Sequence, residues 1–104
     1  MTEDQAASAF AGLANRTRLR LFRLLVRAGD PGLNVGDLQR LLDIPASTLS
    51  HHLSALATAG LIVQERQGRE VISRADYDGV RRMMAYLTDE CCKGIDLRKA
   101  SAAA

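Results

Sequence analysis

The 104-residue sequence has only two cysteines, and they are adjacent, at Cys91 and Cys92. Neighbouring cysteines cannot join distant parts of a chain, which excludes a small secreted scaffold held by disulfides. No run of about 18 apolar residues occurs, so we expect no membrane-spanning segment and no membrane partner. The polar, acidic start MTEDQAAS is unlike a signal peptide. These absences predict a cytoplasmic protein.

Sequence signs of catalysis are also missing. The chain shows no glycine-rich phosphate loop, and no pair of carboxylates stands out as a general acid and base. Both histidines, His51 and His52, fall within one predicted helix, which leaves none for a Cys-His-Asp arrangement. We therefore expect neither an enzyme nor a permanently bound cofactor.

The composition fits one small globular domain, with 47% hydrophobic and 25% charged residues. A domain of this size buries little more than about 60% of its unfolded surface, so association with a second copy would help its stability. The net charge is only +2, but 12 of the 14 basic residues are arginines, whose planar guanidinium suits phosphate. We assign residues 1–94 to one domain and 95–104 to a flexible tail.

The segment 45–56, PASTLSHHLSAL, carries the strongest pattern in the chain. Leucines 49, 53 and 56 have the spacing of one buried helical face. The opposite side is polar and contains no acidic residue; its members, which we call the reading face, are Ser47, Ser50, His51 and Ser54. Short donors of this kind can approach DNA closely and bond to base edges.

A shorter helix is predicted just before it, at Val35 to Leu42, with the turn Asp43-Ile44-Pro45 between the two. This layout is that of a helix-turn-helix. An ordinary amphipathic helical pair has a similar pattern and remains an alternative. In the DNA-reading interpretation, Ser47, Ser50 and His51 face the major groove, and Thr48 lies near the DNA backbone. His52 is expected to pack within the domain.

The flanking segments complete a mainly α fold with one small β-hairpin. Helices are predicted at 5–14, 17–28 and 76–93, and short strands at 61–66 and 71–74. A hairpin directly after a recognition helix is a wing, and Arg66 and Arg69 at its tip are suited to DNA phosphates. The same arginines could serve only solubility.

The last helix carries an apolar stripe of Val80, Met84, Leu87 and Cys91 at i, i+4, i+7 and i+11. No later element is available to cover it. Pairing of the terminal helices across a two-fold axis would bury it, although packing inside the monomer is an alternative. A dimerisation module that does not read DNA is a further interpretation, and the reading face argues against it.

This order of elements resembles the ArsR/SmtB family of winged-helix repressors, from about Phe10 to Cys92. The most specific parts are LANRTRLRLFRLL (13–25), VGDLQRLLDIPASTLSHHLSALATAGLI (35–62) and the wing QERQGREV (64–71). The resemblance implies a homodimer that binds double-stranded operator DNA, represses transcription and releases the DNA when an inducer binds.

The family's inducer sites are only partly matched. One metal- and arsenite-sensing branch opens the helix before the recognition helix with Cys-Val-Cys-Asp-Leu, where this chain has Asn34-Val35-Gly36-Asp37-Leu38. The zinc-sensing branch uses Asp and His ligands from the last helix, and here that helix has no histidine. The segment YLTDECC (86–92) resembles another arsenite-sensing branch, in which a cysteine pair ends the last helix and a third cysteine commonly follows.

This chain has no third cysteine. Two thiolates, from Cys91 and Cys92, would leave one ligand position of arsenite or antimonite to another donor, but would complete the shell of a mono-substituted trivalent arsenical. The resemblance therefore implies a trivalent arsenical as the inducer. Sensing of thiol oxidation or reactive sulfur by the same pair is the alternative, and a purely structural role at a helix end is another.

Overall fold

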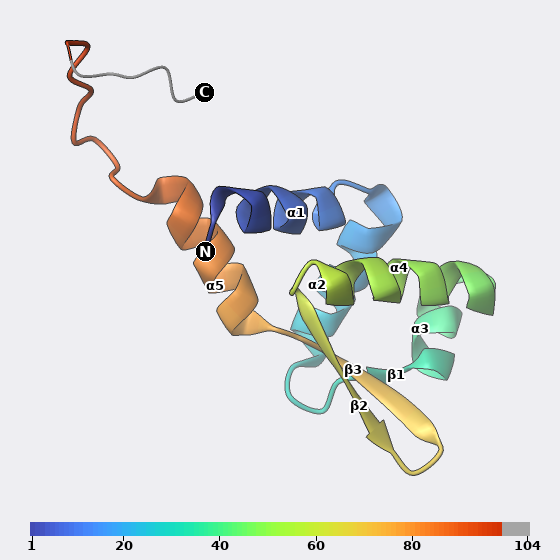
Figure 1. The fold of residues 1–104 in the computed structure, drawn as a ribbon. Helices are drawn as coiled ribbons and strands as arrows, with labels where there is room; N and C mark the ends of the chain where they lie inside the picture. The colour runs from blue at the N-terminus through green and yellow to red at the C-terminus, as the bar shows by residue number, and fades with distance from the viewer. Residues whose placement is uncertain (99–104) are drawn as a thin grey trace.

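A computed structural model describes residues 1–98. Its elements follow one another as α1 (Glu3–Leu13), α2 (Arg16–Ala28), β1 (Leu33–Asn34), α3 (Val35–Leu42), α4 (Ala46–Thr58), β2 (Ile62–Gln67), β3 (Glu70–Ala75) and α5 (Tyr77–Thr88). This is the winged helix-turn-helix expected from the sequence, and Figure 1 shows the hairpin of β2 and β3 projecting below the helices. We call residues 62–75 the wing.

Local capping explains where the first helices begin. Thr2 and Gln5 form a capping box at the start of α1, so this helix starts two residues earlier than the apolar spacing predicted. Asn15 interrupts the helical pattern because its side chain caps α2, accepting from the backbone N–H groups of Thr17 and Arg18.

The recognition helix α4 packs through the predicted face: Leu49, Leu53 and Leu56 are all buried. They share one core with α2, whose Leu21 and Leu25 are fully buried. Because α4 packs against α2 through this apolar face, the opposite side of α4 remains at the surface.

The turn before α4 and the turn after it both depend on left-handed residues. Asp43 ends α3 in the left-handed region, with φ of 52°, a conformation that aspartate tolerates better than most side chains. After α4, Gly60 has φ of 76°, and Leu61 N–H bonds back to the carbonyl of Leu56. This closure directs the chain straight from the recognition helix into the wing.

The sheet contains one strand that the sequence pattern did not predict. Its order is β1-β3-β2, all antiparallel, with Leu33 opposite Ser73 and Asn34 opposite Ile72. The short strand β1 therefore joins the start of α3 to the base of the wing. At the tip, Gln67 pairs with Glu70 across a two-residue turn. Gly68 supplies the positive φ that the first central position of such a turn requires.

The last helix ends earlier than predicted. The apolar spacing extended it to residue 93, but α5 ends at Thr88, and residues 89–92 form turns. Continuing the helix would place the negative charges of Asp89 and Glu90 at its C-terminal end, where the helix dipole is also negative and repels them. Glu90 instead adopts a left-handed conformation, with φ of 61°. Cys91 is therefore not part of the α5 stripe, and the cysteine pair follows the helix instead of ending it.

Gly79 allows α5 to lie close to the end of α4. A Cβ at this position would overlap the backbone carbonyl oxygen of Gly60, so only glycine fits without a shift of one element. Figure 1 shows α5 passing beside the N-terminal end of α1, after which the chain leaves the body of the domain.

Part of the predicted tail, residues 99–104, lies outside the described residues. Among the helices of residues 1–98, none is long and apolar enough to cross a membrane.

Candidate nucleic-acid interface and thiol site

The reading face of α4 is exposed along its whole length. The side chains of Ser47, Ser50, His51 and Ser54 are exposed, and so is that of Thr48. No side chain caps the start of α4, because its N-cap residue is Pro45. The first backbone N–H groups of this helix thus remain available to an acceptor such as a phosphate oxygen.

His52 faces inward, as expected. It is buried, with 9% of its surface accessible, and its Nδ1 lies 3.5 Å from the Arg18 guanidinium. Burial first, and then the charge of Arg18, lower the pKa of His52 below its ordinary value. Arg18 also donates from Nε to the carbonyl of Gly12 at 2.6 Å, so it joins α1, α2 and α4 beneath the reading face.

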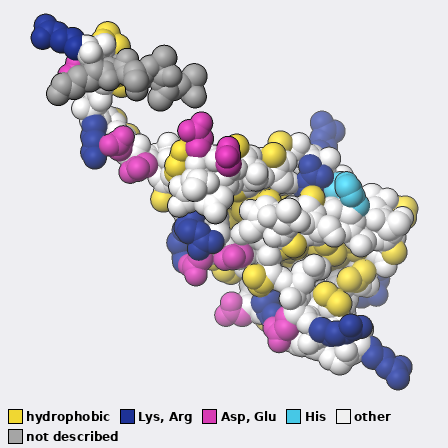
Figure 2. All heavy atoms as spheres, in the orientation of Figure 1, with side chains coloured by type: hydrophobic (Ala, Val, Ile, Leu, Met, Phe, Trp, Pro, Cys, Tyr) yellow, Lys and Arg dark blue, Asp and Glu magenta, His cyan; other side chains and the backbone are white. Residues whose placement is uncertain are grey.

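Two arginines stand at the free end of the wing. Arg66 and Arg69 are exposed, and neither takes part in a salt bridge within residues 1–98. In Figure 2 basic side chains project from the lower right end of the molecule, where the hairpin of Figure 1 ends, and a histidine lies on the surface of the helical layer above it. The arginines can therefore meet a polyanion without first breaking an ion pair.

The sequence reasoning missed a contact between the helix-turn-helix and the wing. The side-chain oxygen of Asn34 accepts from Asp37 N–H at 2.8 Å and caps α3. Its side-chain nitrogen donates to Glu70 Oε1 at 3.2 Å. The preference of helices for asparagine at the N-cap could have indicated the first bond. Nothing in the sequence indicated the second, because 36 positions separate the partners.

Cys91 and Cys92 come together in the turn after α5. Both are exposed and free, and their sulfurs lie 3.1 Å apart. The hydrogen bond to Cys92 raises the pKa of the Cys91 thiol. Lys93 follows the pair, and its ammonium lies 3.8 Å from a carboxylate oxygen of Glu90. The positive charge of Lys93 near the thiols is therefore partly balanced by this carboxylate.

The two sulfurs are the compact thiol pair that the sequence suggested, on a turn instead of a helix. Thiolate–metal bonds are about 2.3 Å long, so two sulfurs on one centre lie at most about 4.6 Å apart. The observed separation meets this limit. Within residues 1–98, no cluster of three or more His, Cys, Asp or Glu side chains could hold a metal ion.

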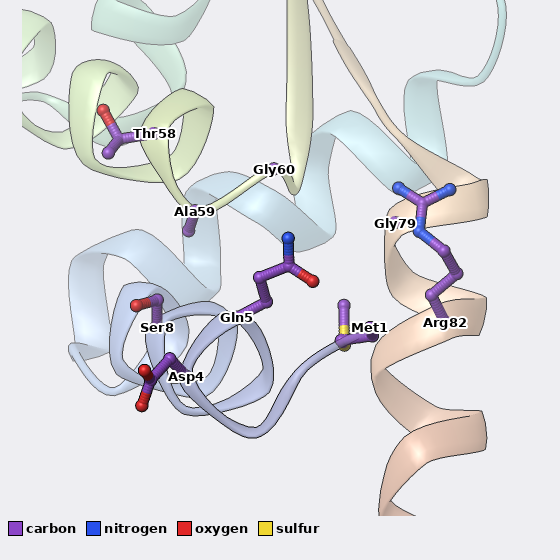
Figure 3. Close-up of a pocket in the computed structure, with 9 residues that line it drawn as sticks. All are labelled: Met1, Asp4, Gln5, Ser8, Thr58, Ala59, Gly60, Gly79 and Arg82. Carbon is purple, nitrogen blue, oxygen red and sulfur yellow. The ribbon is translucent and has the colours of Figure 1, made fainter.

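The outer side of α5 is apolar and exposed. Met84, Tyr86 and Leu87 have 49%, 39% and 62% of their surfaces accessible, whereas Met83 packs into the core. The predicted stripe is thus only partly covered within the monomer. A cavity of about 430 Å³ lies between α1, α5 and the end of α4, with Asp4, Ala59 and Arg82 among its lining residues (Figure 3). None of the predicted site residues lines this cavity.

A wing and a recognition helix with an exposed, acid-free polar face define a DNA-binding protein of the winged helix-turn-helix class. The comparisons with known proteins agree. Residues 13–65 match a family described as a helix-turn-helix domain. A solved structure described as a possible transcriptional regulator for arsenical resistance is 30% identical, covers 77% of this chain and 80% of its own, and has a TM-score of 0.68.

Two further relatives indicate which family of winged helix-turn-helix proteins the chain resembles. The homodimeric winged helix-turn-helix domain Mb0332 of Mycobacterium bovis, a possible ArsR-family regulator, is 28% identical with a TM-score of 0.68, covering 82% of this chain and 77% of its own. A candidate arsenical resistance operon repressor of Halobacterium salinarum is 41% identical over 59 residues, which are 57% of this chain and 45% of that protein. The chain belongs to the ArsR/SmtB family of winged-helix transcriptional repressors.

Proposed function

We propose that this repressor is a homodimer that binds operator DNA and leaves it when Cys91 and Cys92 capture a trivalent arsenical. The observation that carries the inducer assignment is the pair of exposed sulfurs 3.1 Å apart. In the DNA complex, Ser47, Ser50 and His51 read base edges in the major groove, Thr48 meets the backbone, and Arg66 and Arg69 bind phosphates.

Dimerisation is supported by the exposed apolar side of α5 and by the homodimer described for Mb0332. Burying Met84 and Leu87 against a second copy would remove apolar surface from water, the usual driving force for association. In our proposal α1 and α5 form this seam, which leaves both reading faces and both wings free for two DNA half-sites.

Capture needs no other protein ligand when the arsenical already carries one carbon substituent. Each thiol sulfur forms a bond to arsenic, and each hydroxyl that arsenic loses leaves as water with the thiol proton. Methylarsonous acid, with one methyl and two hydroxyl groups, then binds both sulfurs and fills its three positions. Arsenite or antimonite would keep one hydroxyl or take a third donor from outside the pair.

The chemistry of the pair favours arsenical capture over oxidation. Oxidation begins when a thiolate attacks the oxidant, and the hydrogen bond to Cys92 raises the pKa of Cys91, which disfavours the thiolate form. Capture of an arsenical transfers the thiol protons to the leaving hydroxyls, so the reaction as a whole neither consumes nor releases a proton. A disulfide between adjacent residues must also bring two Cβ atoms to about 3.8 Å within a very small ring. Oxidation sensing remains the second candidate because both thiols are exposed.

The position of the pair bears on how release occurs. Because α5 already ends at Thr88, arsenic does not have to unwind a helix to join the sulfurs. Capture instead fixes the turn at 89–92, which directly follows the apolar part of α5. Release requires only that the arsenical binds better to a dimer whose reading faces no longer match half-sites about one DNA turn, or about 34 Å, apart.

The test is release from a labelled operator, followed by fluorescence anisotropy, during titration with arsenite, methylarsonous acid or hydrogen peroxide. Cys91→Ser and Cys92→Ser should each keep operator affinity and lose the response to both arsenicals, because one thiol cannot chelate. Thr88→Ser, three residues before Cys91, should respond like the unaltered protein. If a variant that carries both Cys91→Ser and Cys92→Ser still leaves the operator when an arsenical is added, the sensor lies elsewhere. If the unaltered protein is released by peroxide but by neither arsenical, oxidation sensing is favoured.

A further inference from the structure

The outer half of the wing has little support from the rest of the domain. Strand β1 pairs with β3 only at Ser73 and Ile72, so residues 66–71 extend beyond the sheet as a two-stranded hairpin (Figure 1). Such a hairpin alone is marginally stable in water. The arginines that are proposed to meet phosphate stand on this unsupported part.

One side-chain hydrogen bond joins this outer part to the body of the domain within residues 1–98: the bond from Asn34 to Glu70. Asn34 is itself fixed, because its other side-chain atom caps α3, the first helix of the helix-turn-helix. Its backbone lies in β1, paired with Ile72. The same residue therefore contacts the helix-turn-helix and the wing.

Glu70 immediately follows Arg69 at the tip. A free carboxylate at this place would repel the DNA phosphates that Arg69 attracts. Bound to Asn34, the carboxylate is held toward the start of α3, where it lines a surface hollow with Arg40 and Arg69.

We infer that Asn34 and Glu70 are positioning residues that fix the wing relative to the helix-turn-helix, so that Arg69 reaches phosphate in register with the reading face. This inference rests on the wing's role in the proposed function. It assigns a DNA-binding role to two side chains that need not touch DNA.

The experiment compares two variants with the same charge. Glu70→Gln and Glu70→Ala both remove the carboxylate, but glutamine keeps an oxygen that accepts from Asn34. We expect Glu70→Ala to bind operator and random duplexes about threefold to tenfold more weakly than Glu70→Gln, the range for one hydrogen bond. Its salt dependence should also be flatter by about one unit of slope, as for one lost phosphate contact.

Asn34→Ser provides the second half of the test. Serine still caps α3, but it is too short to reach Glu70. This variant should bind DNA at least as weakly as Glu70→Ala, because it also frees the Glu70 carboxylate, and the double variant should bind no more weakly than Asn34→Ser alone. Thermal unfolding should stay close to that of the unaltered protein, while amide exchange at residues 66–71 should become faster in both variants.

Equal DNA binding by Glu70→Gln and Glu70→Ala would overturn the inference, as would additive losses in the double variant. Arg69→Ala separates this failure from that of the proposed function. An unchanged salt slope for Arg69→Ala would remove Arg69 from the DNA interface and overturn the inference together with the phosphate contact proposed for this residue. A flatter slope for Arg69→Ala, with equal binding by the two Glu70 variants, would overturn only the positioning role.

Discussion

At the scale of single residues, the reading face consists of three serines and one histidine and contains no acidic side chain. If Ser50 and His51 contact base edges, Ser50→Ala and His51→Ala should each reduce the preference for operator over random DNA by about 1–3 kcal/mol. Competition binding with the two duplexes measures this preference. Ser8→Ala, at an exposed serine of α1 outside the reading face, is the control and should change the preference little. Equal weakening on both duplexes would mean that these residues hold the backbone but do not specify sequence.

His52, the neighbour of His51, should make folding depend on pH. Its pKa is lowered in the folded state, chiefly by burial, so the unfolded chain binds the proton more readily. This histidine therefore supports full stability above its ordinary pKa of 6.5, and stability decreases as the pH falls through the lower, folded value. The slope for one group is at most about 1.4 kcal/mol per pH unit.

Urea unfolding at pH 7.5 and 5.5 measures this effect. His52→Gln should lose less stability than the unaltered protein over that interval, since glutamine has no proton to gain. The exposed His51→Gln is the control and should retain most of the decrease, because the charge of His51 is the smallest of the three causes that lower the pKa of His52. If the two variants show the same decrease, protonation of His52 is not its source.

At the scale of elements, the wing should act through charge and not through sequence. Arg66→Ala and Arg69→Ala should weaken binding to operator and random DNA alike, and each should flatten the salt dependence by roughly one unit of slope for a lost phosphate contact. Anisotropy titrations at several salt concentrations give the slopes. Arg81→Ala, on α5 and paired with Asp78, removes a similar charge away from the wing and should leave the slope unchanged. Unchanged slopes for both wing variants would exclude these arginines from the interface.

The elements also show where sequence reasoning succeeds. The face of α4 and the bounds of α3 were predicted because apolar periodicity and turn residues are local signals. Strand β1 was missed because two residues have no period and their partners lie about 40 positions later. The end of α5 was placed too late because the apolar spacing continues to Cys91, whereas the acidic residues after Thr88 end the helix. The Asn34–Glu70 bond depends on the tertiary fold, so the pattern of residues around either partner does not reveal it.

At the scale of the whole molecule, the proposed arsenical capture and the proposed operator binding would make different demands on a dimer. The two sulfurs that would hold arsenic belong to one chain and lie 3.1 Å apart, so capture needs no second protomer. Operator binding would need a second protomer, because the two half-sites of an operator have to be contacted together. A change at the seam should therefore separate the two activities.

Leu87→Glu tests this separation. It places a charge on an apolar side chain of α5 that is 62% exposed in the monomer, so the fold should survive while the seam is lost. Sedimentation should show a monomer that still binds one methylarsonous acid per chain but has lost most of its operator affinity. Leu41→Glu, on α3 and similarly exposed at 53%, is the control and should remain dimeric. If Leu87→Glu stays dimeric, the seam lies elsewhere; if it loses arsenical binding, the site requires both protomers, and capture by a single cysteine pair is wrong.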